Sequence, residues 1–86
     1  MKHVIFTILD TKVNSYSPPF YARSIGEGIR TITSTLKNPE IQLSQYPDDF
    51  KLFHIGTFCD ETAIIELYPT GSELVGLLSQ FMPDQA

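Results

Sequence analysis

The basic residues in the middle of the chain have a regular spacing. Arg23, Arg30 and Lys37 lie seven residues apart, and on a helix this spacing places them on one stripe at intervals of about 10 Å. Two aromatic residues, Phe20 and Tyr21, precede the first arginine. Cations that follow a phosphate backbone, together with an aromatic ring on which a base can stack, are typical of proteins that bind single-stranded nucleic acid. The pattern therefore predicts a nucleic-acid-binding ridge.

The same stripe could also be an ordinary solvated helix face. Glu27 is placed to form ion pairs with Arg23 and Arg30 across one helical turn. The chain has ten acidic and six basic residues and a net charge of −4, whereas Lys and Arg drive phosphate binding. The overall charge favours this second interpretation, and the sequence leaves both open.

Two glycines follow Arg23 closely. Gly26 and Gly28 could let backbone N–H groups approach an anion at a helix start. The fragment lacks the third glycine of a nucleotide-binding loop, and no strand–turn–helix nucleotide unit surrounds it. The alternative interpretation is that these glycines permit close packing where a strand leads into a helix.

Residues of metal-binding type are present without the spacing of a metal site. His3, His54, Cys59 and Asp60 form no short paired motif of the C-x-x-C or H-x-x-x-H kind. The two histidines could be cross-strand neighbours if their strands pair. We expect two strand histidines, a buried structural thiol and no metal or other cofactor.

The acidic residues Asp48, Asp49, Asp60 and Glu61 flank one predicted strand. A paired-carboxylate hydrolase would need two of them to converge in an apolar cleft, but the first two follow a proline and are typical of a turn and a cap. A Cys–His nucleophilic pair would need an orienting group and an oxyanion hole, and the sequence indicates neither. We expect no enzymatic activity.

The length of 86 residues indicates one domain, residues 1–86. A composition of 42% hydrophobic and 19% charged residues argues against disorder. A single cysteine permits no internal disulfide.

The apolar run near the N-terminus is too short to span a bilayer and lacks a cleavage site, so we expect neither a membrane anchor nor a signal peptide. A domain this small has a modest core, and we expect a homo-oligomer, with a dimer favoured.

The first strand is predicted at His3–Leu9, where β-branched and aromatic residues dominate. Its even-numbered positions from Val4 to Ile8 occupy one face and its odd-numbered positions the other. Both faces are largely apolar, which indicates a central or doubly covered strand. After a proline-containing loop, residues 20–23 could begin a helix or form a second strand, and we favour the strand.

A capping box at Ser24 and Glu27 predicts a helix over about 25–37, which ends where Asn38 precedes Pro39. Its apolar stripe has spacings of four, three and four residues. The stripe consists of Ile25, Ile29, Ile32 and Leu36. The cations should therefore face solvent.

Residues 39–49 form a long connection, with Ile41 and Leu43 as possible anchors. A strand at 50–59 should alternate Phe50, Leu52, His54 and Phe58 against Lys51, Phe53, Ile55 and Thr57. A turn and a partner strand at 63–68 follow. The capping spacing of Thr70 and Glu73, with Leu74, Leu77, Leu78 and Phe81 on one face, predicts a short C-terminal helix at about 71–81.

The predicted fold class is therefore α+β. It has a small antiparallel sheet of three or four strands and two helices, in the order β(β)αββα. The predicted core residues are Ile5, Phe6, Ile29, Ile32, Phe53, Ile55, Ile65 and Leu78.

From Phe6 to about Thr62 the chain resembles the small nonstructural protein of gokushoviruses, the Microviridae branch of tailless single-stranded DNA phages. Several short motifs carry the resemblance through their order and spacing. They are Phe20-Tyr21-Ala22, Arg23-Ser24, Gly26-Glu27, Ile29-Arg30, Asn38-Pro39, Tyr46-Pro47-Asp48-Asp49-Phe50, Leu52-Phe53, Ile55-Gly56, Phe58 and Asp60. Gly28 and Cys59 depart from the pattern.

The resemblance implies a non-enzymatic bacteriophage protein, absent from the mature capsid, that acts in the host bacterial cytoplasm during viral DNA replication or packaging. Single-stranded DNA binding or a switch in replication is one implied role, and no catalytic residues carry over. The alternative is a protein-interaction factor that engages a viral or host replication component and makes no contact with nucleic acid.

Overall fold

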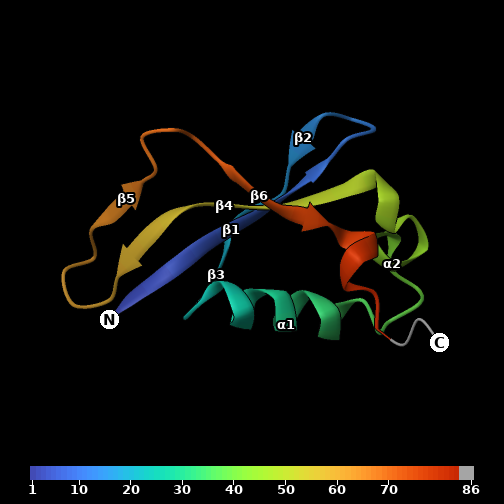
Figure 1. Cartoon of the computed structure of the whole chain (residues 1–86), viewed down its shortest axis with the longest axis horizontal. Coiled ribbons are helices and arrows are strands. Elements are labelled where there is room, and N and C mark those ends of the chain that lie inside the picture. The colour runs from blue at the N-terminus through green and yellow to red at the C-terminus, as the bar shows by residue number, and fades with distance from the viewer. Residues whose placement is uncertain (84–86) are drawn as a thin grey trace.

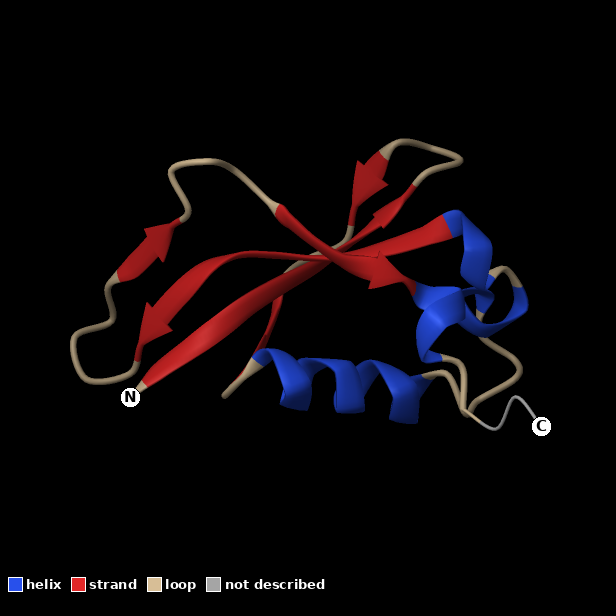
Figure 2. Cartoon of the chain, in the orientation of Figure 1, coloured by secondary structure: helices blue, strands red, loops and turns tan. Residues whose placement is uncertain are grey.

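The computed structural model describes residues 1–83 and has two layers, an antiparallel sheet and one main helix packed on one of its faces (Figures 1 and 2). The strands are β1 Lys2–Asp10, β2 Ser15–Tyr16, β3 Phe20–Ala22, β4 Phe50–Cys59, β5 Ile65–Leu67 and β6 Glu73–Leu77. The main helix is α1 Ile25–Thr35, and single turns form α2 Gln42–Gln45, η1 Pro47–Asp49 and η2 Leu78–Phe81. The α+β prediction is confirmed.

The sheet is built on two long central strands. β1 and β4 pair antiparallel along their length, with β2 and β3 beside β1 and with β5 and β6 beside β4. Six strands exceed the predicted three or four. Each half of the sheet is nevertheless four strands wide, because β2 and β3 occupy different parts of one edge and β5 and β6 different parts of the other. The predicted strand at residues 20–23 is present as β3.

A β-bulge changes the faces of β4. Ile5 pairs with Gly56 and Phe6 pairs with His54, so Ile55 is an extra residue in β4. A bulge of this kind reverses the alternation beyond it. Phe58 therefore pairs with His3 and leaves the face of Leu52, which corrects the predicted alternation. The same register separates His3 from His54, so the two histidines are not cross-strand neighbours.

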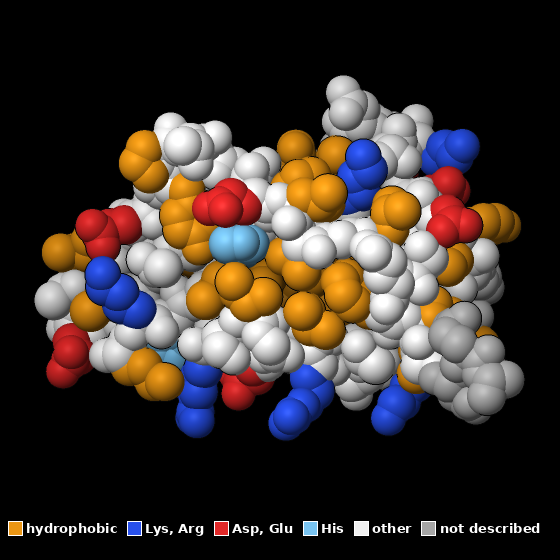
Figure 3. Space-filling model, in the orientation of Figure 1, with side chains coloured by type: hydrophobic (Ala, Val, Ile, Leu, Met, Phe, Trp, Pro, Cys, Tyr) orange, Lys and Arg blue, Asp and Glu red, His pale blue; other side chains and the backbone are white. Residues whose placement is uncertain are grey.

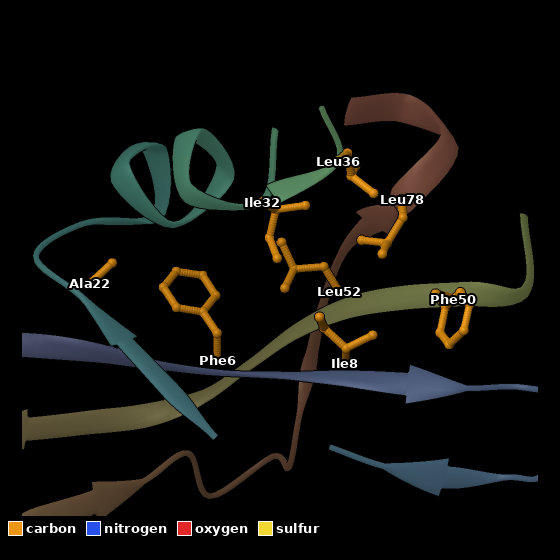
Figure 4. Close-up of a cluster of buried hydrophobic side chains, with 8 residues drawn as sticks. All are labelled: Phe6, Ile8, Ala22, Ile32, Leu36, Phe50, Leu52 and Leu78. Atoms are coloured by element: carbon orange, nitrogen blue, oxygen red, sulfur yellow. The ribbon is translucent and has the colours of Figure 1, made fainter. Parts of the chain in front are cut away.

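The core lies between α1 and one face of the sheet (Figure 4). Ile32 and Leu36 from the helix end meet Leu52 from β4 and Leu78 from the last turn. The complete buried cluster is Phe6, Ile8, Ala22, Ile32, Leu36, Phe50, Leu52 and Leu78. Burial increases along the apolar stripe, since Ile25 is exposed and Leu36 is buried.

The predicted core is correct in part. Ile5, Phe6, Ile32 and Leu78 are buried, and Ile29 packs against the cluster. Phe53 and Ile55 are only partly buried, and Phe53 pairs with Thr7 on the sheet face that α1 does not cover. The prediction that Ile65 is buried is wrong, because its side chain is 52% exposed on the edge strand β5.

The predicted C-terminal helix at about 71–81 is wrong. Glu73–Leu77 forms β6, which pairs with Lys51–His54 of β4, and only Leu78–Phe81 makes a single 3₁₀ turn. The short β5 pairs with residues 56–58 alone, so this other part of β4 needs a second partner for its backbone groups. That need, and the burial of Leu78, outweigh the local helical spacing.

The connection between α1 and β4 is ordered by local contacts. Ser44 Oγ donates to the backbone oxygens of Leu36 and Asn38 at 3.2 and 2.6 Å. Leu43 packs against the core, as predicted for an anchor. Across residues 1–83, no helix has both the length and the apolarity needed to cross a membrane.

Candidate nucleic-acid interface

The three predicted cations lie along one exposed edge of the molecule. Ser24 caps α1 by accepting a hydrogen bond from the Glu27 N–H at 3.1 Å, and Arg23 immediately precedes this cap. Arg23, Arg30 and Lys37 are all exposed. We call these three residues the cationic edge. In Figure 3, Lys and Arg side chains project in a row from the margin formed by α1.

The cationic edge forms no ion pair with any other residue in the described range 1–83; the pairs found there join other groups. The predicted partner Glu27 instead accepts a hydrogen bond from the backbone N–H of Arg23, at 3.0 Å. Four acidic residues are engaged with cations elsewhere. They are Asp49, Asp60, Glu61 and Glu66. The edge therefore carries three cations beside one carboxylate, that of Glu27, although the chain is negative overall.

The two predicted stacking residues lie on opposite faces of β3. Phe20 pairs with Phe6 and stacks on its ring, with centroids 5.2 Å apart and planes at 16°. This ring packs against the core. Tyr21 pairs with Ile5 on the other face and is 49% exposed. Of the two aromatic residues, Tyr21 is thus the one with a widely accessible ring.

Tyr21 borders an apolar hollow on the face of the sheet that α1 leaves uncovered. The hollow has a volume of about 400 Å³ and is lined by His3, Tyr21, Phe58 and Ile65. We call it the aromatic hollow. Four different strands supply its four residues, and the rings of Tyr21 and Phe58 meet edge-on, with centroids 5.9 Å apart. Phe58 was predicted on the face of Leu52, and the one local sign of the bulge at Ile55 is the glycine that follows it inside the strand, Gly56.

An ion-pair cluster holds one side of the aromatic hollow. His3 Nε2 lies 2.9 Å from Asp60 Oδ2, and the Met1 ammonium lies 2.8 Å from Asp60 Oδ1. The hydrogen bond from the ammonium, and then that from His3, lowers the pKa of Asp60. Both carboxylate oxygens are occupied, so this acid presents little free negative charge to a ligand in the hollow.

The remaining candidate groups do not converge. Asp48 and Asp49 precede β4 and Asp60 and Glu61 follow it, so the ten-residue strand separates the two pairs by roughly 30 Å. Among residues 1–83, no three His, Cys, Asp or Glu side chains are placed to hold a metal ion. Cys59 is partly exposed rather than buried, and hydrogen bonding to the Thr62 side chain lowers the pKa of its thiol.

The glycines before the middle of α1 differ in their surroundings. A Cβ at Gly28 would overlap the ring of Phe6, whereas a Cβ at Gly26 would meet nothing closer than Ser24 Oγ at 3.9 Å. The close-packing interpretation is therefore confirmed for Gly28. No described contact explains Gly26.

The chain matches a known protein family over a range that includes both the cationic edge and the aromatic hollow. The family model described as Phage ORF5 protein matches residues 3–81, which include α1, five complete strands and most of β1. The chain belongs to the phage ORF5 protein family. No curated protein and no solved structure matches it. The family match thus supports the phage affiliation that the resemblance implied.

Proposed function

We propose that this ORF5 family protein is a nonstructural, non-enzymatic protein of a gokushovirus-like phage that binds single-stranded DNA in the host cytoplasm during replication or packaging. The cationic edge is the observation that carries this proposal. Three exposed cations lie in sequence along α1: Arg23 just before its N-cap, Arg30 within it and Lys37 just after its C-cap. None forms an ion pair with a described residue. Such a row can neutralise successive phosphates of a flexible strand.

The aromatic hollow supports the same proposal. Arg23 is two residues from Tyr21, so their Cα atoms lie within about 7 Å of each other. A DNA single strand bound along the cationic edge as far as Arg23 can therefore direct one base toward the exposed ring of Tyr21. Stacking on aromatic rings is tolerant of sequence, since every base has a flat π face. This combination suits general single-strand binding better than recognition of one duplex sequence.

The test is the salt dependence of binding. A labelled oligothymidylate, followed by fluorescence anisotropy, should bind tightly at low salt and weaken steeply as salt rises. Replacing Arg30 by Ala should weaken binding and reduce the slope of log K against log salt by about 0.7, the contribution of one phosphate contact on a single strand.

Lys12→Ala is the matched control. Lys12 lies in the β1–β2 turn, away from α1 (Figure 1), and pairs with Asp49 at 3.9 Å. The Lys12→Ala substitution removes one positive charge, as Arg30→Ala does, but leaves the cationic edge unchanged. Absence of measurable binding by the unaltered protein at low salt would rule out the proposal.

A protein-interaction factor is the second candidate, and exposed aliphatic side chains favour it. Ile64, Leu67 and Leu74 are all more than half exposed, and clustered apolar surface often marks a protein interface. In this role the protein would bind a viral or host replication component. Affinity purification from infected cells would then yield a defined protein with no bound DNA, and Arg30→Ala would leave that association intact.

A further inference from the structure

The sheet face opposite α1 carries two matching pairs of aromatic rings. Tyr21 and Phe58 meet with centroids 5.9 Å apart and planes at 67°, and Tyr16 and Phe53 meet with centroids 5.9 Å apart and planes at 66°. The register places both pairs on the face of Ile5 and Thr7, away from the helix. In each pair the tyrosine is about half exposed.

Each pair also has a cation close to it. Arg23 is two residues from Tyr21 along the chain, and Lys51 is two residues from Phe53 on the same side of β4. Lys51 also pairs with Leu9, which in turn pairs with Tyr16 on the other side of β1. Each aromatic pair is thus accompanied by a positively charged side chain within reach.

Carboxylates are missing from this face among the paired strand residues of the described chain. The strand acids that have a register partner are Asp10, Glu66 and Glu73. Asp10 pairs with Phe50, Glu66 with Thr57 and Glu73 with His54, and all three partners lie on the face toward α1. Asp60, at the margin, has both oxygens engaged. The paired strand residues of the uncovered face therefore include two aromatic pairs and Lys51 but no carboxylate, and Asp10 borders Tyr16 from the edge.

We infer that this face is a stacking platform for single-stranded DNA, with one unpaired base on the Tyr21–Phe58 pair and another on the Tyr16–Phe53 pair. The inference rests on the proposed function and identifies where the bases bind. Tyr21 pairs with Ile5 and Tyr16 with Leu9, so the two sites are about 13 Å apart along β1. That distance corresponds to about four stacked nucleotides at 3.4 Å each.

The charges on the face favour DNA over a second copy of this chain. A face-to-face dimer would bring the unpaired cations of one protomer toward those of the other, with no strand carboxylate between them. A phosphate backbone instead supplies the missing negative charge. The aromatic hollow, about 400 Å³ in volume, also falls in the range of small-molecule sites.

The test compares Tyr16→Ser, Tyr21→Ser and the double variant in binding to labelled oligothymidylate. Each single change should weaken binding about tenfold through lost stacking. The double change should weaken it by about the product of the two, since the sites are separate. The salt slope should stay unchanged, because the phosphate contacts remain. Tyr16→Phe and Tyr21→Phe should bind like the unaltered protein.

Tyr46→Ser is the matched control. Tyr46 is 58% exposed, comparable with Tyr16 at 53%, but it lies in the α2–η1 corner and not on the platform. A second measurement uses tyrosine emission, since the chain has four tyrosines and no tryptophan. Bound bases should quench this emission, and the double variant should show less quenching than Tyr46→Ser.

The outcomes separate the inference from the proposed function. If the unaltered protein fails to bind at low salt, the proposed function and the platform both fall. If binding persists with its salt dependence, but the tyrosine variants match Tyr46→Ser, the platform is wrong and the cationic edge alone explains binding. If the variants instead dissociate an oligomer and leave DNA affinity unchanged, a second copy occupies the face and the platform is again wrong.

Discussion

Gly28 shows how one missing side chain sets the spacing between the two layers. The ring of Phe6, which is fully buried, occupies the position that a Cβ at Gly28 would take. Glycine is otherwise a poor helix former. Its presence here is explained by contact with β1 rather than by any property of α1 alone.

Gly28→Ala should destabilise the fold. Displacing a buried ring costs about 1–3 kcal/mol, and the better helix propensity of alanine returns only about 1 kcal/mol. Urea unfolding should therefore give a lower midpoint. Gly26→Ala is the control, because its Cβ has space, and it should be neutral or stabilising by up to about 1 kcal/mol. Equal midpoints for the two variants would contradict the packing.

The ion pairs of Asp60 should make the stability of the protein fall at both low and high pH. The pKa of Asp60 lies below the ordinary value of 3.8 because of hydrogen bonds from the Met1 ammonium and from His3. Its contribution is therefore present above about pH 4 and is lost as pH falls through the lowered pKa. The hydrogen bond to Asp60 raises the pKa of the Met1 ammonium above 8.0, so that contribution is present below pH 8 and is lost as pH rises further.

Asp60→Asn should accordingly lower the unfolding midpoint most between about pH 4 and pH 8, with the difference from the unaltered protein shrinking at both extremes. Urea titrations of both proteins across this range measure the difference. Asp48→Asn, which removes an exposed carboxylate outside these ion pairs, controls for the change in charge. A difference in midpoint that does not change with pH would show that the charge of Asp60 does not stabilise the fold.

Among the elements, α1 is the one that local chemistry defines most directly. Ser24 accepts from the Glu27 N–H, and the Glu27 carboxylate accepts from the Arg23 N–H. The helix begins at Ile25 as predicted and ends at Thr35, two residues before the predicted end. Threonine hydroxyls along it donate to backbone oxygens four residues earlier, which weakens the intrinsic preference for helix.

Ser24→Ala should destabilise the protein by about 1 kcal/mol, because the cap satisfies a backbone N–H that would otherwise lack a partner. Ser34→Ala is the matched control: Ser34 is an exposed residue within α1, and its replacement by a better helix former should be neutral or slightly stabilising. Chemical denaturation measures both. Equal loss of stability in the two variants would argue against the cap.

The segment from Glu73 to Phe81 behaves differently from α1. Its leucines fit a helical stripe as well as they fit the strand and turn that the structure contains. The choice depends on β4, whose residues Lys51–His54 pair with this segment. An element whose local signals are balanced takes the conformation that its neighbours require.

At the scale of the whole molecule, one layer of helix covers one face of the sheet (Figure 2). The other face keeps large side chains in contact with solvent, including Tyr16, Tyr21, Ile65 and Leu74. A chain of 86 residues buries only roughly 60% of its unfolded surface. Self-association would add to this modest burial, and the dimer remains a prediction from the sequence.

Light scattering at micromolar concentration tests that prediction. A dimer should scatter with about twice the chain mass of 9.7 kDa. The edge strand β5 offers the best surface for it, because its three residues are all exposed and an open strand edge can pair with another chain. Leu67→Lys should then shift the protein toward the monomer, while Lys12→Ala should not. A species of 9.7 kDa throughout defeats the idea.

The sequence alone determined the features that depend on neighbours along the chain. These are the cap at Ser24, the start of α1, the long strands β1 and β4, and the outward direction of Arg23, Arg30 and Lys37. Hydrogen bonds across one helical turn and the alternation of an extended chain depend on residues a few positions apart. Such signals can be read before the fold is known.

Only the tertiary structure decided the features that depend on pairing between distant segments. The bulge at Ile55 places Phe58 on the face of Tyr21. Glu73–Leu77 forms a strand because it pairs with an otherwise open edge of β4. The pairing of β3 with β1 places Phe20 and Tyr21 on opposite faces. Register reflects the sum of many contacts between strands, and a shift of one residue exchanges the two faces. The aromatic face therefore became visible only once the strands were paired.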